Sequence, residues 1–161
     1  MIGDPGSQAT APSLPLEAWI EREAYALGFD LVGFVRLGIA ETAGHFDDWL
    51  AYGREGEMHY LSRDPTLRHD TRRPLPGAIS AIVVGMNYGG RESTGPIARY
   101  ARGDDYHDVM RTRLRQLHGM LSERVGAEVP GRPYVDTAPI LERDLARRAG
   151  LGWFGKNTNL I

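Results

Sequence analysis

The sequence contains no cysteine among its 161 residues. This absence excludes a disulfide, a thiolate nucleophile and an iron-sulfur cluster of the usual kind held by this chain. No apolar run approaches the roughly 18 residues that a membrane-spanning helix needs, and the start of the chain shows no signal-peptide pattern. We therefore expect no membrane association, and the cytoplasm is the default location.

An excess of charge of either sign is also lacking. There are 19 Lys and Arg against 21 Asp and Glu, a net charge of −2, which provides no electrostatic reason for nucleic-acid binding by this chain alone. The apolar content of 42% and charged content of 25% are ordinary for a soluble globular protein. No phosphate-binding loop is present. The glycines of GLGWFG have dinucleotide-motif spacing, but they follow a predicted helix rather than a strand.

The order of the predicted elements indicates an α/β or α+β fold with a central mixed sheet flanked by helices. Residues 1–14 are small and polar and are predicted to form a disordered tail, with a single domain over 15–161. The strand over 78–89 is apolar on both faces and is expected to be fully buried. Hydrophobic periodicity and glycine or proline stops predict the other elements: helices over 15–27, 45–52 and 104–125, a helical turn over 58–61, a strand over 29–37, a loop over 62–77 and a polar connection over 90–103.

The stretch from Tyr134 to Asn157 concentrates the candidate chemistry. A short buried strand is predicted to end just before Asp136, and a helix with Pro139 in its first turn is predicted to follow. Polar residues, Asp144 among them, fill the faces of that helix away from its apolar stripe, and Gly150 ends it as a left-handed cap. The glycine-rich turn beyond it is of a kind that lets backbone approach a neighbour closely.

Two interpretations of Asp136 follow from this context. A carboxyl at the end of a strand occupies a position where α/β folds present functional groups, and burial against an apolar cofactor would raise its pKa enough for a general acid. A plain helix cap is the alternative, and the local sequence by itself favours the cap.

Four segments, in order, resemble the epoxyqueuosine reductase family, the cobalamin- and iron-sulfur-dependent enzymes that complete queuosine in tRNA. The resemblance covers about residues 16–161, and its segments are WLAYGREGEMHYL (49–61), PGAISAIVVGMNY (76–88), RYARGDDYH (99–107) and VDTAPILER…AGLGWFGKN (135–157). It implies a cobalamin-binding domain similar to the nitroreductase-type fold. In the family, two cysteine-rich cluster motifs and a helical-repeat tRNA-binding region follow this part.

The same resemblance implies roles for individual residues. Asp136 corresponds to the family's proton donor, and His107 lies near the substrate side of the corrin; both are candidate catalytic residues, although an ordinary surface role for His107 is an equal alternative. No residue is assigned to a metal. The candidate cofactor-binding residues are Met58, His59, Arg143, Gly152, Trp153, Lys156 and Asn157.

Five of the cofactor candidates have a simpler alternative. Met58 and His59 can pack a small satellite core, Arg143 can lie on a solvated helix face, and Lys156 and Asn157 suit a turn. Gly152 is expected to permit close approach of backbone to the ring.

The function implied is that of the N-terminal part of an epoxyqueuosine reductase, an oxidoreductase that reduces epoxyqueuosine in tRNA with cobalamin and an external electron donor. The [4Fe-4S] clusters of the family are not ligated by this chain, so the piece alone is expected to be inactive. One alternative is a stand-alone cobalamin-binding or processing module without redox clusters. Another is a scaffold domain without a ligand.

Overall fold

The structure is a computed structural model that describes residues 14–89 and 96–161. The predicted tail falls outside these residues except for Leu14, as does part of the predicted connection over 90–103. No helix in the described ranges is long and apolar enough to cross a membrane. The elements in chain order are α1 (Leu16–Ala26), β1 (Leu31–Arg36), α2 (Ala43–Ala51), α3 (Thr66–His69), β2 (Ser80–Gly85), the 3-10 turn η1 (Arg99–Ala101), α4 (Tyr106–Val125) and α5 (Glu142–Arg148).

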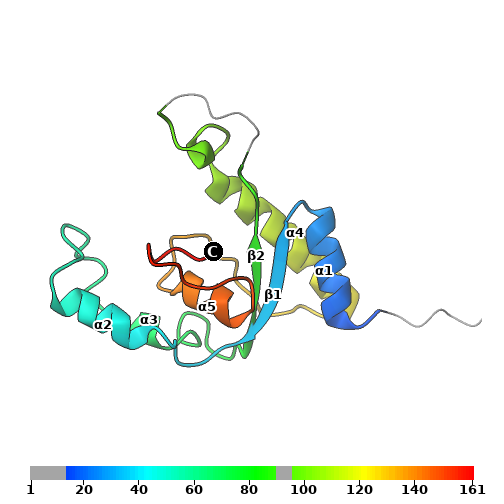
Figure 1. The fold of residues 1–161 in the computed structure, drawn as a ribbon. Coiled ribbons are helices and arrows are strands. Elements are labelled where there is room, and N and C mark those ends of the chain that lie inside the picture. The colour runs from blue at the N-terminus through cyan, green and yellow to red at the C-terminus, as the bar shows by residue number, and fades with distance from the viewer. Residues whose placement is uncertain (1–13, 90–95) are drawn as a thin grey trace, which may run out of the picture.

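The sheet consists of β1 and β2, paired antiparallel with Leu31 opposite Gly85 and Arg36 opposite Ser80. Helices α1 and α4 lie on one side of this sheet and α5 on the other, while α2 and α3 lie further out (Figure 1). The α/β class is confirmed. The expected mixed sheet is replaced, in the described part of the chain, by two antiparallel strands.

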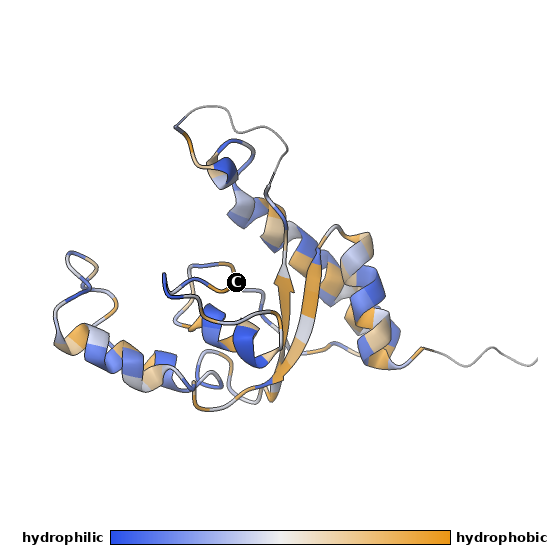
Figure 2. Ribbon diagram, viewed as in Figure 1, coloured by the Kyte–Doolittle hydropathy of each residue, from blue (hydrophilic) through white to orange (hydrophobic). Residues whose placement is uncertain are grey.

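The core forms where α1 and α4 cover β1. Its buried members are Ile20, Ala24, Phe29, Val32 and Leu117. The apolar stripe of α4 supplies Leu117 and its neighbours one helical turn away, as the period of the sequence predicts. The strands carry the most continuous hydrophobic colour of the ribbon, whereas α5 is largely hydrophilic (Figure 2).

Both long helices have the predicted bounds to within two residues, because their end signals are local. Gly28 has a φ of +85° and ends α1, and Gly126 with a φ of +73° ends α4. The Asp105 side chain caps α4 by accepting the His107 backbone N–H at 2.9 Å. Segment 58–61 forms a hydrogen-bonded turn rather than a helix, and α3 lies inside the predicted loop 62–77.

The predicted full burial of 78–89 is wrong. The strand itself spans only Ser80–Gly85, its residues are mostly half-buried, and the side chain of Ile79 just before it is 75% exposed. The reason is that β2 pairs with β1 on one edge only, and its other edge has no partner strand among the described residues.

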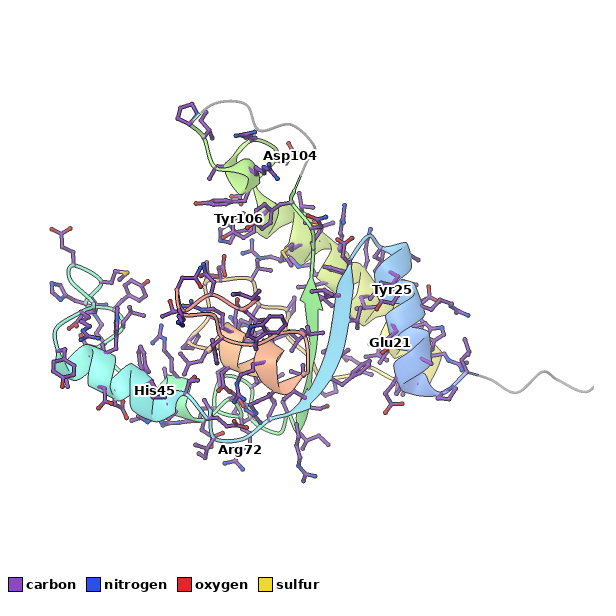
Figure 3. All side chains as sticks on the ribbon, in the orientation of Figure 1. Glu21, Tyr25, His45, Arg72, Asp104 and Tyr106 are labelled. Carbon is purple, nitrogen blue, oxygen red and sulfur yellow. The ribbon has the colours of Figure 1, made fainter. Side chains whose placement is uncertain are left out.

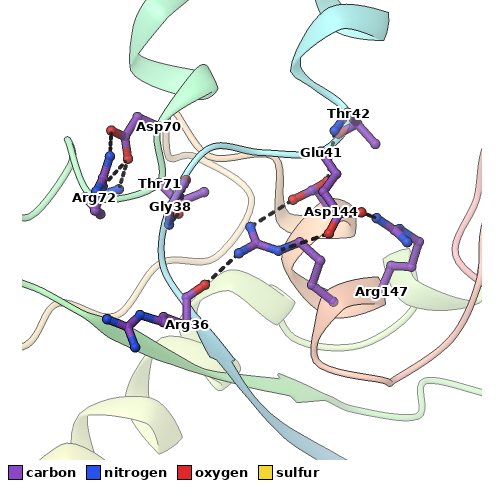
Figure 4. A network of polar contacts seen from close by, with 10 residues as sticks. Arg36, Gly38, Glu41, Thr42, Asp70, Thr71, Arg72, Asp144 and Arg147 are labelled. Carbon is purple, nitrogen blue, oxygen red and sulfur yellow. Dashed lines mark hydrogen bonds and ion pairs between the residues drawn. The ribbon is translucent and has the colours of Figure 1, made fainter.

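A buried carboxylate fixes α5 to the chain that follows β1. Asp144 is 1% exposed, accepts the Thr42 backbone N–H at 3.0 Å and pairs with Arg148 at 3.3 Å. Arg148 also donates to the Arg36 carbonyl at 2.6 Å. Figure 4 shows this network between α5 and the segment from Arg36 to Thr42. Asp144 therefore lies in the interior, although the sequence pattern places it on a helix face away from the apolar stripe.

Candidate active site

Asp136 lies in an irregular loop, not at the end of a strand and not at a helix N-terminus. No strand is formed over 131–135, and α5 begins at Glu142 with Leu141 at its N-cap position. The Thr137 N–H donates to the Val135 carbonyl at 2.6 Å, which makes a tight turn around Asp136. Pro139 therefore lies before the helix rather than in its first turn, and the helix starts later than expected. The helix-cap interpretation of Asp136 is therefore wrong.

Two helices hold Asp136 in this loop. The Tyr106 hydroxyl, from the first turn of α4, donates a hydrogen bond to Asp136 Oδ2, and the Asp136 backbone N–H donates to Glu142 Oε1 at 3.0 Å. The φ of Asp136 is +54°, a left-handed conformation that few residues other than glycine adopt. Figure 3 shows Tyr106 at the start of α4, next to Asp104. The hydrogen bond to Asp136 raises the pKa of Tyr106 to about 12, so its hydroxyl keeps its proton.

Glu142 is the residue that sequence reasoning missed. Its carboxyl is half-buried, and burial together with the negative charge of Asp136 raises the pKa of Glu142 to about 7. A glutamate in the first helical turn often accepts a backbone N–H that precedes the helix, and this is the one local signal of its role. Near neutral pH, Glu142 can therefore hold a proton beside Asp136.

His107 completes the cluster. Its ring stacks on Tyr106 with centroids 4.1 Å apart, and its Nδ1 lies 2.8 Å from Asp105 Oδ1. The charge of His107 is also one of the influences on Glu142, where it opposes the rise in pKa. The two predicted catalytic residues, Asp136 and His107, thus belong to one group of side chains.

An apolar groove of about 640 Å³ opens beside this cluster. It runs along the unpaired edge of β2, since consecutive strand residues from Ser80 to Val84 line it, and α4 and α5 contribute Leu114 and Leu145. Asp136 and Glu142 also line it. An apolar groove with a few convergent polar groups is the usual form of a small-molecule or cofactor site.

Arg143 is the only predicted cofactor-binding residue that lines this groove. Its guanidinium donates to the Thr158 carbonyl at 2.6 Å and so attaches the C-terminal turn to α5. Met58 and His59 lie exposed in the turns after α2, where the Leu61 N–H donates to the Met58 carbonyl at 2.9 Å. The structure does not bring them to Asp136.

The fold of the C-terminal turn explains why position 152 is a glycine. A Cβ on Gly152 would lie 2.5 Å from the Ile161 carbonyl oxygen, so the close backbone approach made there is to the chain itself. Trp153 exchanges backbone hydrogen bonds of 3.0 and 2.8 Å with Ile161, and its side chain is 65% exposed. Lys156 and Asn157 are exposed in the same turn.

The cobalamin implied by the resemblance can be compared with these residues. The apolar walls of the groove, the carboxyls at one end and the Arg143 guanidinium suit a large ring with a polar rim. The other predicted cofactor residues do not line the groove. The clusters of the family do not fit this chain, because it has no cysteine to ligate them. Within the described residues, no three His, Asp or Glu side chains are grouped to hold a metal ion.

Sequence comparison connects this chain to one family. The family model described as "Epoxyqueuosine reductase QueG, DUF1730" matches residues 68–137. The epoxyqueuosine reductase of Xanthomonas campestris pv. campestris is 40% identical over 156 residues, covering 88% of this chain and 42% of that protein. The epoxyqueuosine reductase of Escherichia coli K12 is 38% identical over 152 residues, covering 88% of this chain and 40% of that protein.

Solved structures of epoxyqueuosine reductases share the fold of this chain. An epoxyqueuosine reductase crystallised with a tRNA-Tyr epoxyqueuosine-modified stem loop superposes with a TM-score of 0.72 at 26% identity, covering 90% of this chain and 40% of that one. The Streptococcus thermophilus epoxyqueuosine reductase has a TM-score of 0.77 at 21% identity, covering 89% of this chain and 41% of that one. The resemblance to this family is confirmed, and the chain spans about two-fifths of the length of the relatives it matches.

Proposed function

On the premise that this chain is a partial relative of the epoxyqueuosine reductases, we propose that it forms the acid-catalytic part of such an enzyme, with epoxyqueuosine in tRNA as substrate. The observation that carries the proposal is the cluster of Asp136, Glu142 and Tyr106 beside an apolar groove. The presence of a modified tRNA stem loop in a related structure supports RNA as the carrier of the substrate. The cytoplasmic location expected from the sequence stays a prediction.

The chemistry of deoxygenation defines what these residues have to do. Reducing an epoxide to an alkene consumes a pair of electrons and a pair of protons and releases the oxygen as water. Cobalamin, when bound, would supply the low-potential electrons. The apolar wall of the groove and Arg143 would hold it. The protein's own task is to deliver protons to the departing oxygen, which leaves far more easily as water than as hydroxide.

Asp136 is the residue we assign to the first proton transfer. Its carboxyl is exposed at the groove, whereas its backbone is held by the Glu142 carboxyl and its Oδ2 by the Tyr106 hydroxyl. A general acid positioned in this way contributes roughly 10²–10⁴ in rate. Burial and the charge of Asp136 raise the pKa of Glu142 to about 7, so the two neighbouring carboxyls together hold one proton near neutral pH. Glu142 is the proton reserve of this pair, and Asp136 is the member that passes the proton to the departing oxygen.

Replacing Asp136 tests this assignment. In a protein that completes this chain to the length of its relatives, Asp136→Asn keeps the shape of the side chain but cannot donate the proton. We expect turnover to fall by about 10²–10⁴, with cobalamin absorbance and melting temperature close to wild type. Asp104→Asn, an exposed change nearby, is the matched control. Near-normal turnover of the Asp136→Asn variant would contradict the role.

A second candidate function, a stand-alone cobalamin-binding module, is favoured by one observation, the absence of cysteine. A change in the absorption spectrum of cobalamin added to the purified chain would support both functions against a scaffold domain without a ligand. Joining the chain to a cluster-bearing region distinguishes the two functions. The enzyme portion should then reduce epoxyqueuosine, whereas a stand-alone module should not.

A further inference from the structure

A second hollow, of about 620 Å³, lies on the other side of the Asp136 loop, and arginines dominate its polar lining. Arg111 and Arg115 come from successive turns of one face of α4, Arg73 from the chain after α3, and Arg132 from the segment before the loop. None of the described residues that line this hollow is an Asp or a Glu. On a chain with a net charge of −2, this is a local concentration of positive charge that the overall composition conceals.

The protein itself neutralises little of this charge. Arg111 pairs with Asp108 at 3.3 Å, but that carboxylate is 78% exposed. Arg132 lies over the Tyr134 ring, 5.3 Å from its centroid, which leaves its N–H groups available. Arg115 is exposed, and its side chain makes no hydrogen bond or ion pair with any described residue.

Arg73 is also only weakly paired. It donates a hydrogen bond to the Thr66 hydroxyl. The hydrogen bond from Thr66 is the main cause of the lowered pKa of Asp64, and the charge of Arg73 adds to it. Like charges one helical turn apart, as at Arg111 and Arg115, destabilise a helix unless an anion lies between or near them. The hollow therefore has the electrostatic character of an anion site.

The segment 132–139 forms the wall between this hollow and the groove. Residues 132–135 line both, Asp136 faces the groove, and Thr137 to Pro139 face the hollow. The wall is fixed by the buried Val135 and by the Tyr134 hydroxyl, which donates to the Pro74 carbonyl at 3.2 Å. A ligand in the hollow thus lies one loop's thickness from the proposed proton donor.

We propose that the hollow binds backbone phosphates of the RNA whose modified nucleoside reaches Asp136. Every nucleoside in RNA is flanked by phosphates, so an RNA that presents a base at the groove necessarily brings phosphates close to the same loop. Guanidinium groups bind phosphate oxygens in pairs, with a geometry that lysine cannot match. Phosphate contacts of this kind fix register and orientation rather than sequence. The inference rests on the proposed function, which it extends to the position of the RNA.

Other sources of a phosphate are a bound cofactor and free phosphate ions. The presence of four arginines around a hollow of about 620 Å³ favours the repeating phosphates of a chain over a single ion. The placement of Arg115 and Arg132 at exposed positions also suits a macromolecular ligand.

The test uses the 161-residue chain and a fluorescently labelled RNA stem loop, with anisotropy measured across a series of salt concentrations. Removing three phosphate contacts in the triple variant Arg111→Gln, Arg115→Gln and Arg132→Gln should reduce the slope of log affinity against log salt by about 2–3. The control triple variant Arg22→Gln, Arg54→Gln and Arg63→Gln removes the same charge from exposed positions elsewhere and should leave the slope near that of wild type.

A single substitution keeps the test informative if the triple variant misfolds. Arg115 has no partner to lose among the described residues, so Arg115→Gln should keep the melting temperature and still lower the slope by about 1. Arg115→Lys keeps the charge and should recover most of that slope.

Three outcomes would overturn the proposal. One is the absence of salt-dependent RNA binding by the wild-type chain, and another is an equal loss in the two triple variants. The third is weakened binding of cobalamin or pyrophosphate in the Arg111, Arg115 and Arg132 variant with RNA binding unchanged, which would assign the phosphate to another source. Asp136→Asn should bind RNA normally, so failure of the acid role and failure of the phosphate site are distinguishable.

Discussion

The helix-covered side of the sheet and its open edge along β2 differ in how completely they are packed. Where α1 and α4 cover β1, Ala24 is fully buried and Phe29 is 3% exposed. Along β2, Ile79 is 75% exposed and the strand edge borders an open groove. Of the candidate catalytic groups, Tyr106, Asp136 and Glu142 line this groove. We therefore expect the free energy of folding to depend mainly on the helix-covered side. The proposed chemistry takes place at the open edge, where the backbone is accessible.

The largest effect is expected from a paired truncation across the two sides. Phe29→Ala leaves a cavity in the core and should lower the free energy of unfolding by about 3–5 kcal/mol. Ile79→Ala removes an exposed side chain and should stay within about 0.5 kcal/mol. Urea denaturation followed by circular dichroism measures both. Equal losses of unfolding free energy in the two variants would contradict this difference in packing.

Two aspartates near α5 sharpen the comparison. Asp144→Asn weakens charged hydrogen bonds in the interior and should cost about 1.5–3 kcal/mol of unfolding free energy. Asp136→Asn, in the exposed loop, should cost far less while removing the proton donor. The same denaturation measurements test this, and a larger loss at Asp136 would indicate a structural role for the loop carboxyl.

Gly152→Ala tests whether the C-terminal turn belongs to the folded scaffold. The new Cβ would lie 2.5 Å from the Ile161 carbonyl oxygen, so the turn has to shift, with a cost of about 1–3 kcal/mol. Gly103→Ala, at a position with open space around it, is the control. Unchanged stability together with lost cobalamin binding would instead support a close approach of this glycine to the cofactor.

The last comparison concerns Glu142 and follows one protein across pH. Because its pKa is raised to about 7 from an ordinary value of 4.5, the folded state holds a proton that the unfolded state has lost between these pH values. Stability should therefore fall as pH rises from about 4.5 to about 7, by up to about 3 kcal/mol.

Glu142→Gln should flatten this pH profile, since the amide does not ionise and can still accept the Asp136 N–H. Thermal unfolding between pH 4.5 and 7.5 measures the difference, with Glu41→Gln, at an exposed ion pair, as the control. Parallel profiles for wild type and Glu142→Gln would show that Glu142 is not the buried acid.

Local signals were sufficient for much of this architecture. The stripe of α4, the glycine ends of α1 and α4 and the two apolar strands are short-range features, and each appears near its predicted position. The motif around Asp136 and the presence of His107 nearby were also readable, because the family resemblance rests on contiguous residues.

Only the tertiary structure decided how those residues are used. The Tyr106 hydroxyl reaches Asp136 across 30 positions, and Asp144 meets the Thr42 N–H across 102. Glu142 becomes a proton reserve only because burial and the charge of Asp136 act on it together. Gly152 accommodates the chain's own Ile161, and the arginines beyond the Asp136 loop converge from three separate segments. Helical and strand periodicity are set by neighbours a few residues apart, whereas pKa, burial and charge clustering depend on groups that only the folded chain brings together.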